Sequence, residues 1–408
     1  MPSETTFLIV GAGLAGATAA ATLREEGFAG RIRLIGSEAH APYIRPPLSK
    51  GYLSGKETLE SVFVHPEPWY AEQRIELESG TTVTSIDSVG HRVALSNGED
   101  ARYDRLLLTT GSRPRILNTP GAGLDGVHYL RTLDDSTALR EKIAAGGLRV
   151  VLIGSGWIGM EIAATARQLG NDVTVLDRGV IPLSSALGDE LGAVFGRLHA
   201  DNGVMIRHEV AVSAIVGDGG RATGVDIGGE IVPADLVLIG VGAVPNVELA
   251  EEAGLAVANG ILTDASLQTS SADIFAAGDV ANAQHPVIGQ RLRSEHWANA
   301  LKSGPVAARS MLGQGVVYDE IPYFYTDQFD LGMEYSGYAP LAKKATVVYR
   351  GDVAAREFVA FWQLDGRIVA GMNVNVWDVN EQVQALIREQ RVVDAGRLAD
   401  PGVELASL

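Results

Sequence analysis

The sequence predicts an α/β fold with two parallel-sheet domains, followed by a C-terminal α+β domain. The strongest observation is a Gly-x-Gly-x-x-Gly motif that occurs twice, beginning at Gly11 and at Gly154. Each copy follows an apolar run of strand length and opens a stretch with helical spacing. Strand and helix patterns alternate after each motif, which is typical of parallel sheets covered by helices. Residues 320–408 differ, because they are rich in aromatic residues and read as strands followed by a helix.

Between a strand and a helix, this glycine motif is typical of a dinucleotide site. The glycines allow a tight turn and let the backbone approach a pyrophosphate at the helix N-terminus. An acidic residue follows the next strand in each unit, Glu38 in the first and Asp177 in the second. A carboxylate at that place hydrogen-bonds ribose hydroxyls. We therefore predict two Rossmann-like nucleotide-binding domains, with motif residues Gly11, Gly13, Leu14, Ala15 and Gly16 in the first and Gly154, Gly156, Trp157, Ile158 and Gly159 in the second.

Asp177 also predicts which nicotinamide coenzyme the second site prefers. A carboxylate at the ribose repels a 2'-phosphate, which favours NADH over NADPH. Arg178 leaves an alternative open, because a neighbouring guanidinium is able to accept that phosphate.

The repeat covers a whole unit, because an apolar strand running into Gly and Pro ends each copy, at 106–114 and 236–246. We expect a discontinuous first domain (1–112 and 245–319), a second domain (113–244) and a third (320–408). We also expect helices at 17–26 and 159–169 and an antiparallel crossover made of 82–86 and 92–96. In the third domain, 345–349 and 358–363 read as strands and 380–388 as a helix.

Composition excludes several classes of function. The net charge of −17 argues against nucleic acid or an anionic membrane as a partner. The chain has no cysteine, which excludes thiol relays, cysteine-based peroxidases and a cysteine-ligated iron–sulfur cluster within it. The histidines lack metal-site spacing, so we expect no metal. No apolar run approaches a membrane span and the first strand begins near Phe7, so we expect a cytoplasmic protein.

Four further segments carry a resemblance to a known family. They are a proline-rich segment (Pro42 to Lys50), a Gly-Asp turn (Asp273 to Val280), the second glycine motif with its glutamate (Gly154 to Glu161) and Glu295 to Ala300. Over essentially the whole chain, the sequence resembles the FAD-dependent, NADH-using ferredoxin reductases of bacterial oxygenases and cytochromes P450, which have a glutathione-reductase-like FAD/NAD flavoprotein fold.

The resemblance implies an enzyme that takes hydride from NADH onto FAD. It further implies that electrons pass singly to a [2Fe–2S] ferredoxin, which feeds a P450 or a ring-hydroxylating dioxygenase. The residues it adds for FAD are Arg45, Pro46, Lys50, Arg113, Asp279 and Trp297, and those it adds for NADH are Glu161 and Gly242.

Lys50 and Glu161 are the predicted catalytic residues. We place Glu161 in the first turn of its helix and expect it to form an ion pair with Lys50. The family places this lysine near flavin N5, where a cation stabilises the negative charge of the reduced ring. Other roles stay open for several candidates: Lys50, Arg45 and Arg113 as surface residues, and Trp297 as part of the core.

The chain departs from the family pattern in three places. Tyr323 and Tyr325 stand where the family carries tryptophans before a Ser-Asp-Gln sequence, which here reads Thr-Asp-Gln. Ile181 and Ser185 occupy positions that often hold arginines beyond the NADH acidic residue, and Leu301 replaces a common glutamine.

Alternative functions are a cysteine-independent NADH-dependent rubredoxin or monodehydroascorbate reductase, or an NADH-binding redox sensor of the apoptosis-inducing-factor type. The sequence leaves the choice between monomer and homodimer open. For docking an acidic ferredoxin, the candidate basic residues are Arg291, Arg293, Lys302, Lys343 and Lys344.

Overall fold

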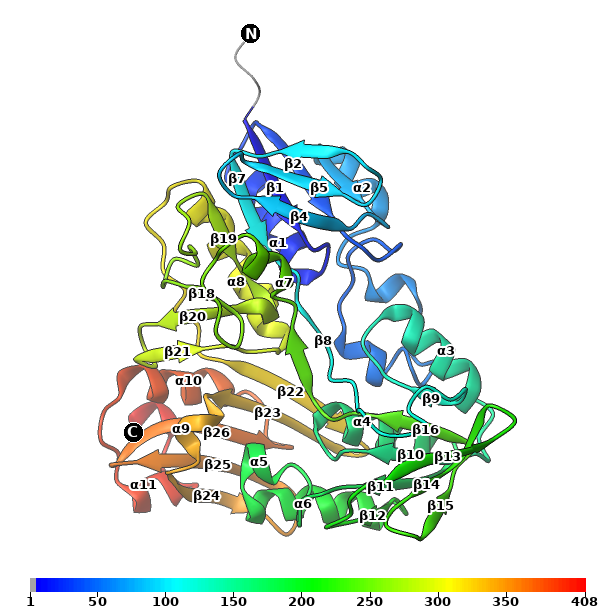
Figure 1. Cartoon of the computed structure of the whole chain (residues 1–408). Helices are drawn as coiled ribbons and strands as arrows, with labels where there is room; N and C mark the ends of the chain where they lie inside the picture. Colours follow the sequence, from blue (N-terminus) through cyan, green and yellow to red (C-terminus); the bar gives the residue numbers. More distant parts are fainter. Residues whose placement is uncertain (1–4) are drawn as a thin grey trace. The chain divides into compact units, whose positions relative to one another are not determined.

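A computed structural model describes residues 5–408 (Figure 1). The chain divides into two compact units. Unit 1 contains the chain up to Ile44, together with Leu59–Arg113 and Val244–Pro322. Unit 2 contains Arg45–Thr58, Pro114–Ala243 and Tyr323–Leu408. The aromatic-rich last part of the chain thus belongs to the same unit as the second glycine motif. Its separation as a third domain stays a prediction.

Unit 1 is built on a five-stranded sheet with the order β19-β7-β1-β2-β3, in which every neighbouring pair is parallel. Its strands are β1 (Thr6–Val10), β2 (Arg31–Ile35), β3 (Ile75–Glu78), β7 (Arg105–Leu108) and β19 (Ile274–Ala276). Helix α1 (Leu14–Glu25) joins β1 to β2, as the first glycine motif predicts. Alanines fill its buried face, and helix α8 (Trp297–Met311) packs against it. A Cβ at Gly304 of α8 would lie 2.5 Å from the Ala15 carbonyl oxygen, so only glycine permits this close approach.

Two small sheets complete unit 1. One is antiparallel, made of β4 (Val83–Asp87), β5 (Arg92–Leu95) and β6 (Asp100–Arg102), which confirms the predicted antiparallel crossover. The other joins β18 (Ile261–Thr263), β20 (Ala281–His285) and β21 (Gln290–Leu292). The remaining elements are η2 (Glu60–Val62), α2 (Glu67–Glu72), α7 (Glu248–Glu252) and η3 (Gly278–Val280).

Unit 2 repeats the parallel arrangement with the order β12-β11-β10-β16-β9. These strands are β9 (Val127–His128), β10 (Arg149–Ile153), β11 (Asp172–Leu176), β12 (Met205–Arg207) and β16 (Leu236–Ile239). Its helices are α3 (Leu133–Ile143), α4 (Trp157–Gln168), α5 (Ser184–Leu187) and α6 (Asp189–Asp201). A three-stranded antiparallel sheet adds β13 (Ala214–Asp218), β14 (Arg221–Asp226) and β15 (Ile231–Pro233), and the 3-10 helix η1 (Pro46–Ser49) comes from the proline-rich segment. Two of the places at which the chain passes between the units lie in β8 (Ser112–Pro114) and β17 (Ala243–Pro245).

The last part of unit 2 is an antiparallel sheet with the order β22-β23-β26-β25-β24. Its strands are β22 (Tyr323–Gln328), β23 (Leu331–Gly337), β24 (Thr346–Asp352), β25 (Glu357–Leu364) and β26 (Arg367–Val374). Helix α10 (Asn380–Glu389) packs on β26 and β23. A short helix, α9 (Ala339–Ala342), joins β23 to β24, and α11 (Ala395–Ala399) and η4 (Leu405–Ser407) follow α10. The α+β character predicted for this region is confirmed.

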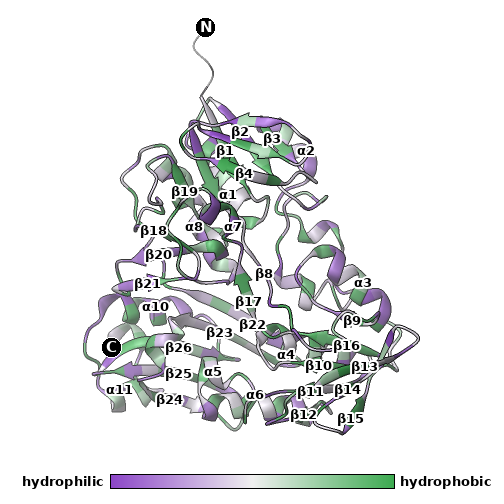
Figure 2. Cartoon of the chain, in the orientation of Figure 1, coloured by the Kyte–Doolittle hydropathy of each residue, from purple (hydrophilic) through white to green (hydrophobic). Residues whose placement is uncertain are grey.

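The cores follow from the hydropathy of the strands. In Figure 2 the strands around β10 and β16 are largely hydrophobic, whereas the helices mix hydrophobic and hydrophilic residues. All of Leu8, Ile9, Leu152 and Leu238 are at most 1% exposed. This pattern is expected for strands covered on both faces. Among the described residues, no helix is both long and apolar enough to cross a membrane.

Candidate active site

The first glycine motif forms a cradle that is open at a single position. Gly11 has φ +114°, and a Cβ there would lie 2.1 Å from the Thr109 carbonyl oxygen. A Cβ at Gly16 would lie 2.1 Å from the Gly11 carbonyl oxygen, so α1 packs directly on the end of β1. Gly13, which caps α1, has open space around its Cβ position. No side chain caps α1 and no acidic residue lies in its first turn, so its free N–H groups suit a phosphate.

The second motif has the same geometry in unit 2. Gly154 has φ +105°, and its Cβ would lie 2.4 Å from the Gly240 carbonyl oxygen. Gly159 packs against Gly154 in the same way as Gly16 packs against Gly11, and Gly156 is open. Helix α4 also begins without a side-chain cap or an acidic residue. Both sites therefore fit a dinucleotide pyrophosphate.

The two predicted ribose-binding acids lie at the ends of equivalent strands and have different partners. Glu38, beyond β2, accepts a hydrogen bond from the Tyr43 hydroxyl. Asp177, beyond β11, accepts one from the Ser155 hydroxyl inside its own glycine motif. Arg178 is exposed. The role of either acid in ribose binding stays a prediction.

Asp279 lies in η3, directly after β19, and its turn is held by two serines. Its Oδ2 accepts a hydrogen bond of 2.9 Å from Ser112 Oγ, and the residue is 8% exposed. The preceding Gly278 has φ +74°, and its N–H donates to Ser303 Oγ over 2.9 Å. Sequence reasoning missed both serines. Ser112 lies in the segment 106–114 that ends the first unit, but no local pattern links it or Ser303 to the Asp279 turn.

Several other candidates contact protein groups. Arg113 donates to Asn246 Oδ1 over 2.8 Å and pairs with Glu248 at 2.5 Å. Arg45 belongs to unit 2 and donates to the Arg131 carbonyl oxygen. Trp297 is the first residue of α8, and Gly242 accepts a 2.8 Å hydrogen bond from the Arg115 N–H. Their cofactor roles stay predictions.

Two residues of the predicted basic docking patch are engaged inside unit 1. Arg291 Nη1 donates to the carbonyl oxygens of Thr263 and Asn282 over 2.6 and 3.0 Å. Arg293, with a side chain 12% exposed, pairs with Glu295 at 2.5 Å. Arg293 Nη1 also donates to the Asp279 carbonyl oxygen over 3.2 Å, so this side chain holds η3 and we withdraw it from the docking patch. Arg291 is exposed, and its place in the patch stays a prediction.

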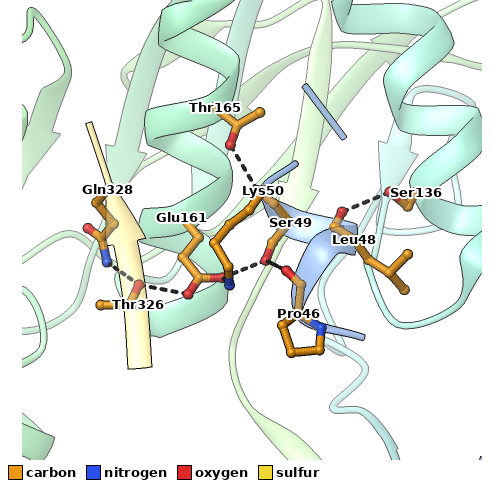
Figure 3. Close-up of polar contacts among 9 residues, drawn as sticks. All are labelled: Pro46, Leu48, Ser49, Lys50, Ser136, Glu161, Thr165, Thr326 and Gln328. Carbon is orange, nitrogen blue, oxygen red and sulfur yellow. Dashed lines mark hydrogen bonds and ion pairs between the residues drawn. The ribbon is translucent and has the colours of Figure 1, made fainter. Parts of the chain in front are cut away.

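Lys50 and Glu161 form the predicted ion pair in unit 2, with 3.0 Å between Nζ and Oε2 (Figure 3). The two side chains are only 16% and 8% exposed. The Ser49 hydroxyl donates to the same carboxylate oxygen, and Thr326 Oγ1 donates to Oε1 over 2.7 Å. The placement of Glu161 in the first helical turn was wrong: α4 begins at Trp157, so Glu161 is in the second turn and acts through these side chains rather than at the helix end.

Hydrogen bonds from two helices hold the backbone of the segment before Lys50. Ser136 of α3 donates to the Leu48 carbonyl oxygen over 2.7 Å, and Thr165 of α4 donates to that of Ser49 over 2.8 Å. Pro46 begins the 3-10 turn and fixes its backbone. Lys50 therefore leaves a rigid turn at a defined place.

Lys50 also lines a cavity of about 270 Å³ in unit 2, together with Pro46, Pro47, Tyr325 and Asp327. Its ammonium lies 5.4 Å from the centre of the Tyr325 ring. Burial raises the pKa of Tyr325 to about 12, so the phenol is neutral at pH 7. Desolvation raises the pKa of Asp327, and the nearby Lys50 charge opposes that effect. The Lys50 ammonium thus lies among several oxygen acceptors.

Comparison with known proteins agrees with this arrangement. The pyridine nucleotide-disulphide oxidoreductase family matches residues 5–304, and the reductase C-terminal family matches residues 323–408. The chain is 40% identical, over 98% of both chains, to the ferredoxin–NAD(+) reductase component of the anthranilate 1,2-dioxygenase system of Burkholderia cepacia. It is 36% identical to putidaredoxin reductase of Pseudomonas putida, covering 100% of this chain and 97% of that one.

A solved structure gives the same result at the level of the fold. The ferredoxin reductase for the CYP199A2 system of Rhodopseudomonas palustris superposes with a TM-score of 0.94 at 37% identity, covering 99% of each chain. The chain contains no cysteine, so the disulphide chemistry in the broader family's name does not apply to it. With two sites that fit a dinucleotide pyrophosphate, the chain belongs to the family of FAD- and NAD(H)-dependent ferredoxin reductases of bacterial dioxygenase and cytochrome P450 systems.

Proposed function

We propose that this chain oxidises NADH and delivers the electrons singly to a [2Fe–2S] ferredoxin that serves a P450 or a ring-hydroxylating dioxygenase. The observation that carries the proposal is the buried Lys50–Glu161 pair of unit 2, in a chain that has two equivalent glycine cradles and no cysteine. When bound, FAD accepts a hydride from NADH and releases the two electrons one at a time. We assign FAD to the cradle of unit 1, with Asp279 as a further contact, and NADH to the cradle of unit 2.

Lys50 supplies positive charge for the step in which the cofactor becomes more negative. An oriented charge is effective when it needs no reorganisation during the reaction. The clamped turn before Lys50 and its ion pair with Glu161 provide that orientation. Glu161 also balances the ammonium charge before reduction, which lowers the cost of burying Lys50.

The partner class is supported by a structural relative. The covalent putidaredoxin reductase–putidaredoxin complex matches this chain with a TM-score of 0.94 at 36% identity, over 99% of this chain. The chain itself has no cysteine to ligate an iron–sulfur cluster, so we place the cluster on the partner. We further propose that the exposed Lys302, Lys343 and Lys344 attract this partner.

Steady-state turnover of the FAD-loaded protein tests the proposal. We expect NADH-driven cytochrome c reduction to rise at least about tenfold when a [2Fe–2S] ferredoxin is added. A rubredoxin and monodehydroascorbate, offered at equal concentration, are the matched alternatives. Faster turnover with either one would contradict the ferredoxin assignment. A long-lived flavin–NAD complex with little turnover would indicate a redox sensor.

A further inference from the structure

A chain of buried polar side chains leads away from the Lys50–Glu161 pair. Thr326 Oγ1 donates a hydrogen bond to Glu161 Oε1 and accepts one of 3.2 Å from Gln328 Nε2 (Figure 3). His199 Nε2 lies 2.8 Å from Gln328 Oε1. His199, Thr326 and Gln328 are at most 1% exposed. Buried polar groups are costly when they lack hydrogen bonds, and every side-chain polar atom of this network except His199 Nδ1 has a partner.

Donor and acceptor roles give this chain of bonds one direction. A carboxylate only accepts, so Thr326 donates to Glu161 and accepts from the Gln328 amide. The Gln328 oxygen then accepts from His199, which places the imidazole proton on Nε2. Burial lowers the pKa of His199 to about 4, so the ring is neutral at pH 7 and carries a single proton. His199 Nδ1 is buried without a hydrogen-bond partner in the described part of the chain, so nothing there favours the other tautomer.

The strand that carries the network also presents a competing carboxylate. Thr326 and Gln328 are two residues apart in β22 and point to the same, buried face. Asp327 lies between them on the opposite face and lines the cavity that contains Lys50. A lysine side chain is flexible and can reach more than one acceptor. Fixing the Glu161 carboxylate with donors on both oxygens therefore decides where the Lys50 ammonium rests.

We propose that Thr326, Gln328 and His199 are positioning residues, which hold the Lys50 ammonium in place by fixing Glu161. The inference rests on the proposed role of Lys50 in flavin reduction. It gives the C-terminal sheet a part in the NADH half-reaction: β22 supplies two of the three residues, and α6 supplies the third.

A pair of substitutions at Thr326 separates the hydrogen bond from side-chain volume. Thr326→Val keeps the volume and removes the hydroxyl, whereas Thr326→Ser keeps the hydroxyl. For Thr326→Val we expect the limiting rate of flavin reduction by NADH to fall about tenfold, in the range of one hydrogen bond to a charged group. The NADH concentration for half-maximal rate should stay unchanged, and the flavin midpoint potential should become more negative. Thr326→Ser should keep both properties close to wild type.

A double-mutant cycle decides whether the effect passes through Lys50. In the Lys50→Met background, Thr326→Val should change neither the rate nor the potential further. Equal effects in the two backgrounds would overturn the positioning role while leaving the role of Lys50 intact. A wild-type rate and potential in Lys50→Met alone would overturn the role of Lys50, and this inference with it. If Thr326→Val fails to retain FAD, the same cycle with Gln328→Met, expected to show about a threefold effect, carries the test.

Discussion

The two glycine cradles have the same backbone geometry but very different surroundings. In unit 1, Gly13 and Leu14 are half-buried and Ala15 is buried. In unit 2, Gly156 is exposed and Ile158 is 47% exposed. The same turn geometry is therefore more buried in unit 1 and more exposed to solvent in unit 2.

The difference extends to the residues that close each site. The turn with Asp279 reaches the carboxyl end of the unit 1 sheet from far along the chain and is fixed by Ser112 and Ser303. In unit 2, Asp177 is held by Ser155 of the same motif, so that site is assembled from neighbouring residues. A site closed by distant segments suits a cofactor that stays bound, whereas an open, local site suits a coenzyme that exchanges in every turnover. This contrast supports the assignment of FAD to unit 1 and NADH to unit 2.

Alanine substitution of the first glycine in each motif should have the largest effects and should separate the two sites. Gly11→Ala places a Cβ 2.1 Å from a carbonyl oxygen at φ +114°, so we expect the protein to lose FAD. Gly154→Ala places a Cβ 2.4 Å from a carbonyl oxygen at φ +105°. This variant should retain FAD, but at a fixed, subsaturating NADH concentration its flavin should be reduced at least about 100-fold more slowly. Flavin absorbance and stopped-flow reduction measure the two outcomes.

Gly170→Ala is the matched control for both variants, because its φ of +85° is also positive but open space surrounds its Cβ position. We expect it to retain FAD and to be reduced normally. Loss of FAD from Gly154→Ala with normal reduction of Gly11→Ala would reverse the assignment of the two cradles.

Lys50→Met should slow flavin reduction by about 10²–10³, the effect of removing one oriented charge from a preorganised site. FAD should remain bound, and its midpoint potential should become more negative. Lys56→Met is the control, since Lys56 lines the same cavity and is not part of the ion pair. Thiol-alkylating reagents should have no effect on the wild-type protein, because it has no cysteine. A rate near wild type with an unchanged potential would make Lys50 a structural residue.

Sequence reasoning reached the parts of the molecule that depend on local chemistry. The strand–glycine–helix units follow from turn geometry and hydrophobic period. In the last part of the chain the patterns predicted β24, β25 and α10, whereas β22, β23 and β26 were not predicted. Long-range packing was less accessible. Thr326 pairs with Glu161 across 165 positions of sequence, and the bond of His199 with Gln328 spans 129 positions. No local pattern marks such partners, although a polar Thr-x-Gln on one face of an aromatic strand was a usable signal.

The errors have the same origin. Arg293 reads as a basic surface residue, yet its side chain is only 12% exposed and its guanidinium group pairs with Glu295. Glu161 was placed one turn too early, because the helix begins at Trp157 rather than after the third glycine. In both cases the environment of the side chain depends on how the chain packs, which the residue type alone does not determine.

Asp177→Ala should narrow the preference for NADH over NADPH about tenfold in kcat/KM, which corresponds to about 1.4 kcal/mol. The carboxylate opposes a 2'-phosphate, and removing it removes that repulsion. Ser155→Ala is the control, since it keeps the carboxylate and removes only its hydrogen bond, so it should have a smaller effect. Equal use of NADPH by the unmodified protein would contradict the assignment and point to Arg178 as the phosphate ligand.

The smallest effect is expected at the surface, from Lys343→Glu combined with Lys344→Glu. Both lysines are exposed. On a chain with net charge −17, such a local pair of positive charges attracts an acidic ferredoxin. Ferredoxin-dependent cytochrome c reduction should slow about threefold at low salt, and the difference should vanish at high salt because screening removes long-range attraction. Ferricyanide reduction by NADH should not change, since it needs no protein docking. Lys142→Glu, an exposed lysine of α3, changes the net charge without altering the proposed patch. If Lys142→Glu slows the ferredoxin reaction per unit charge as much as the Lys343 and Lys344 changes do, the partner responds to overall charge and not to this patch.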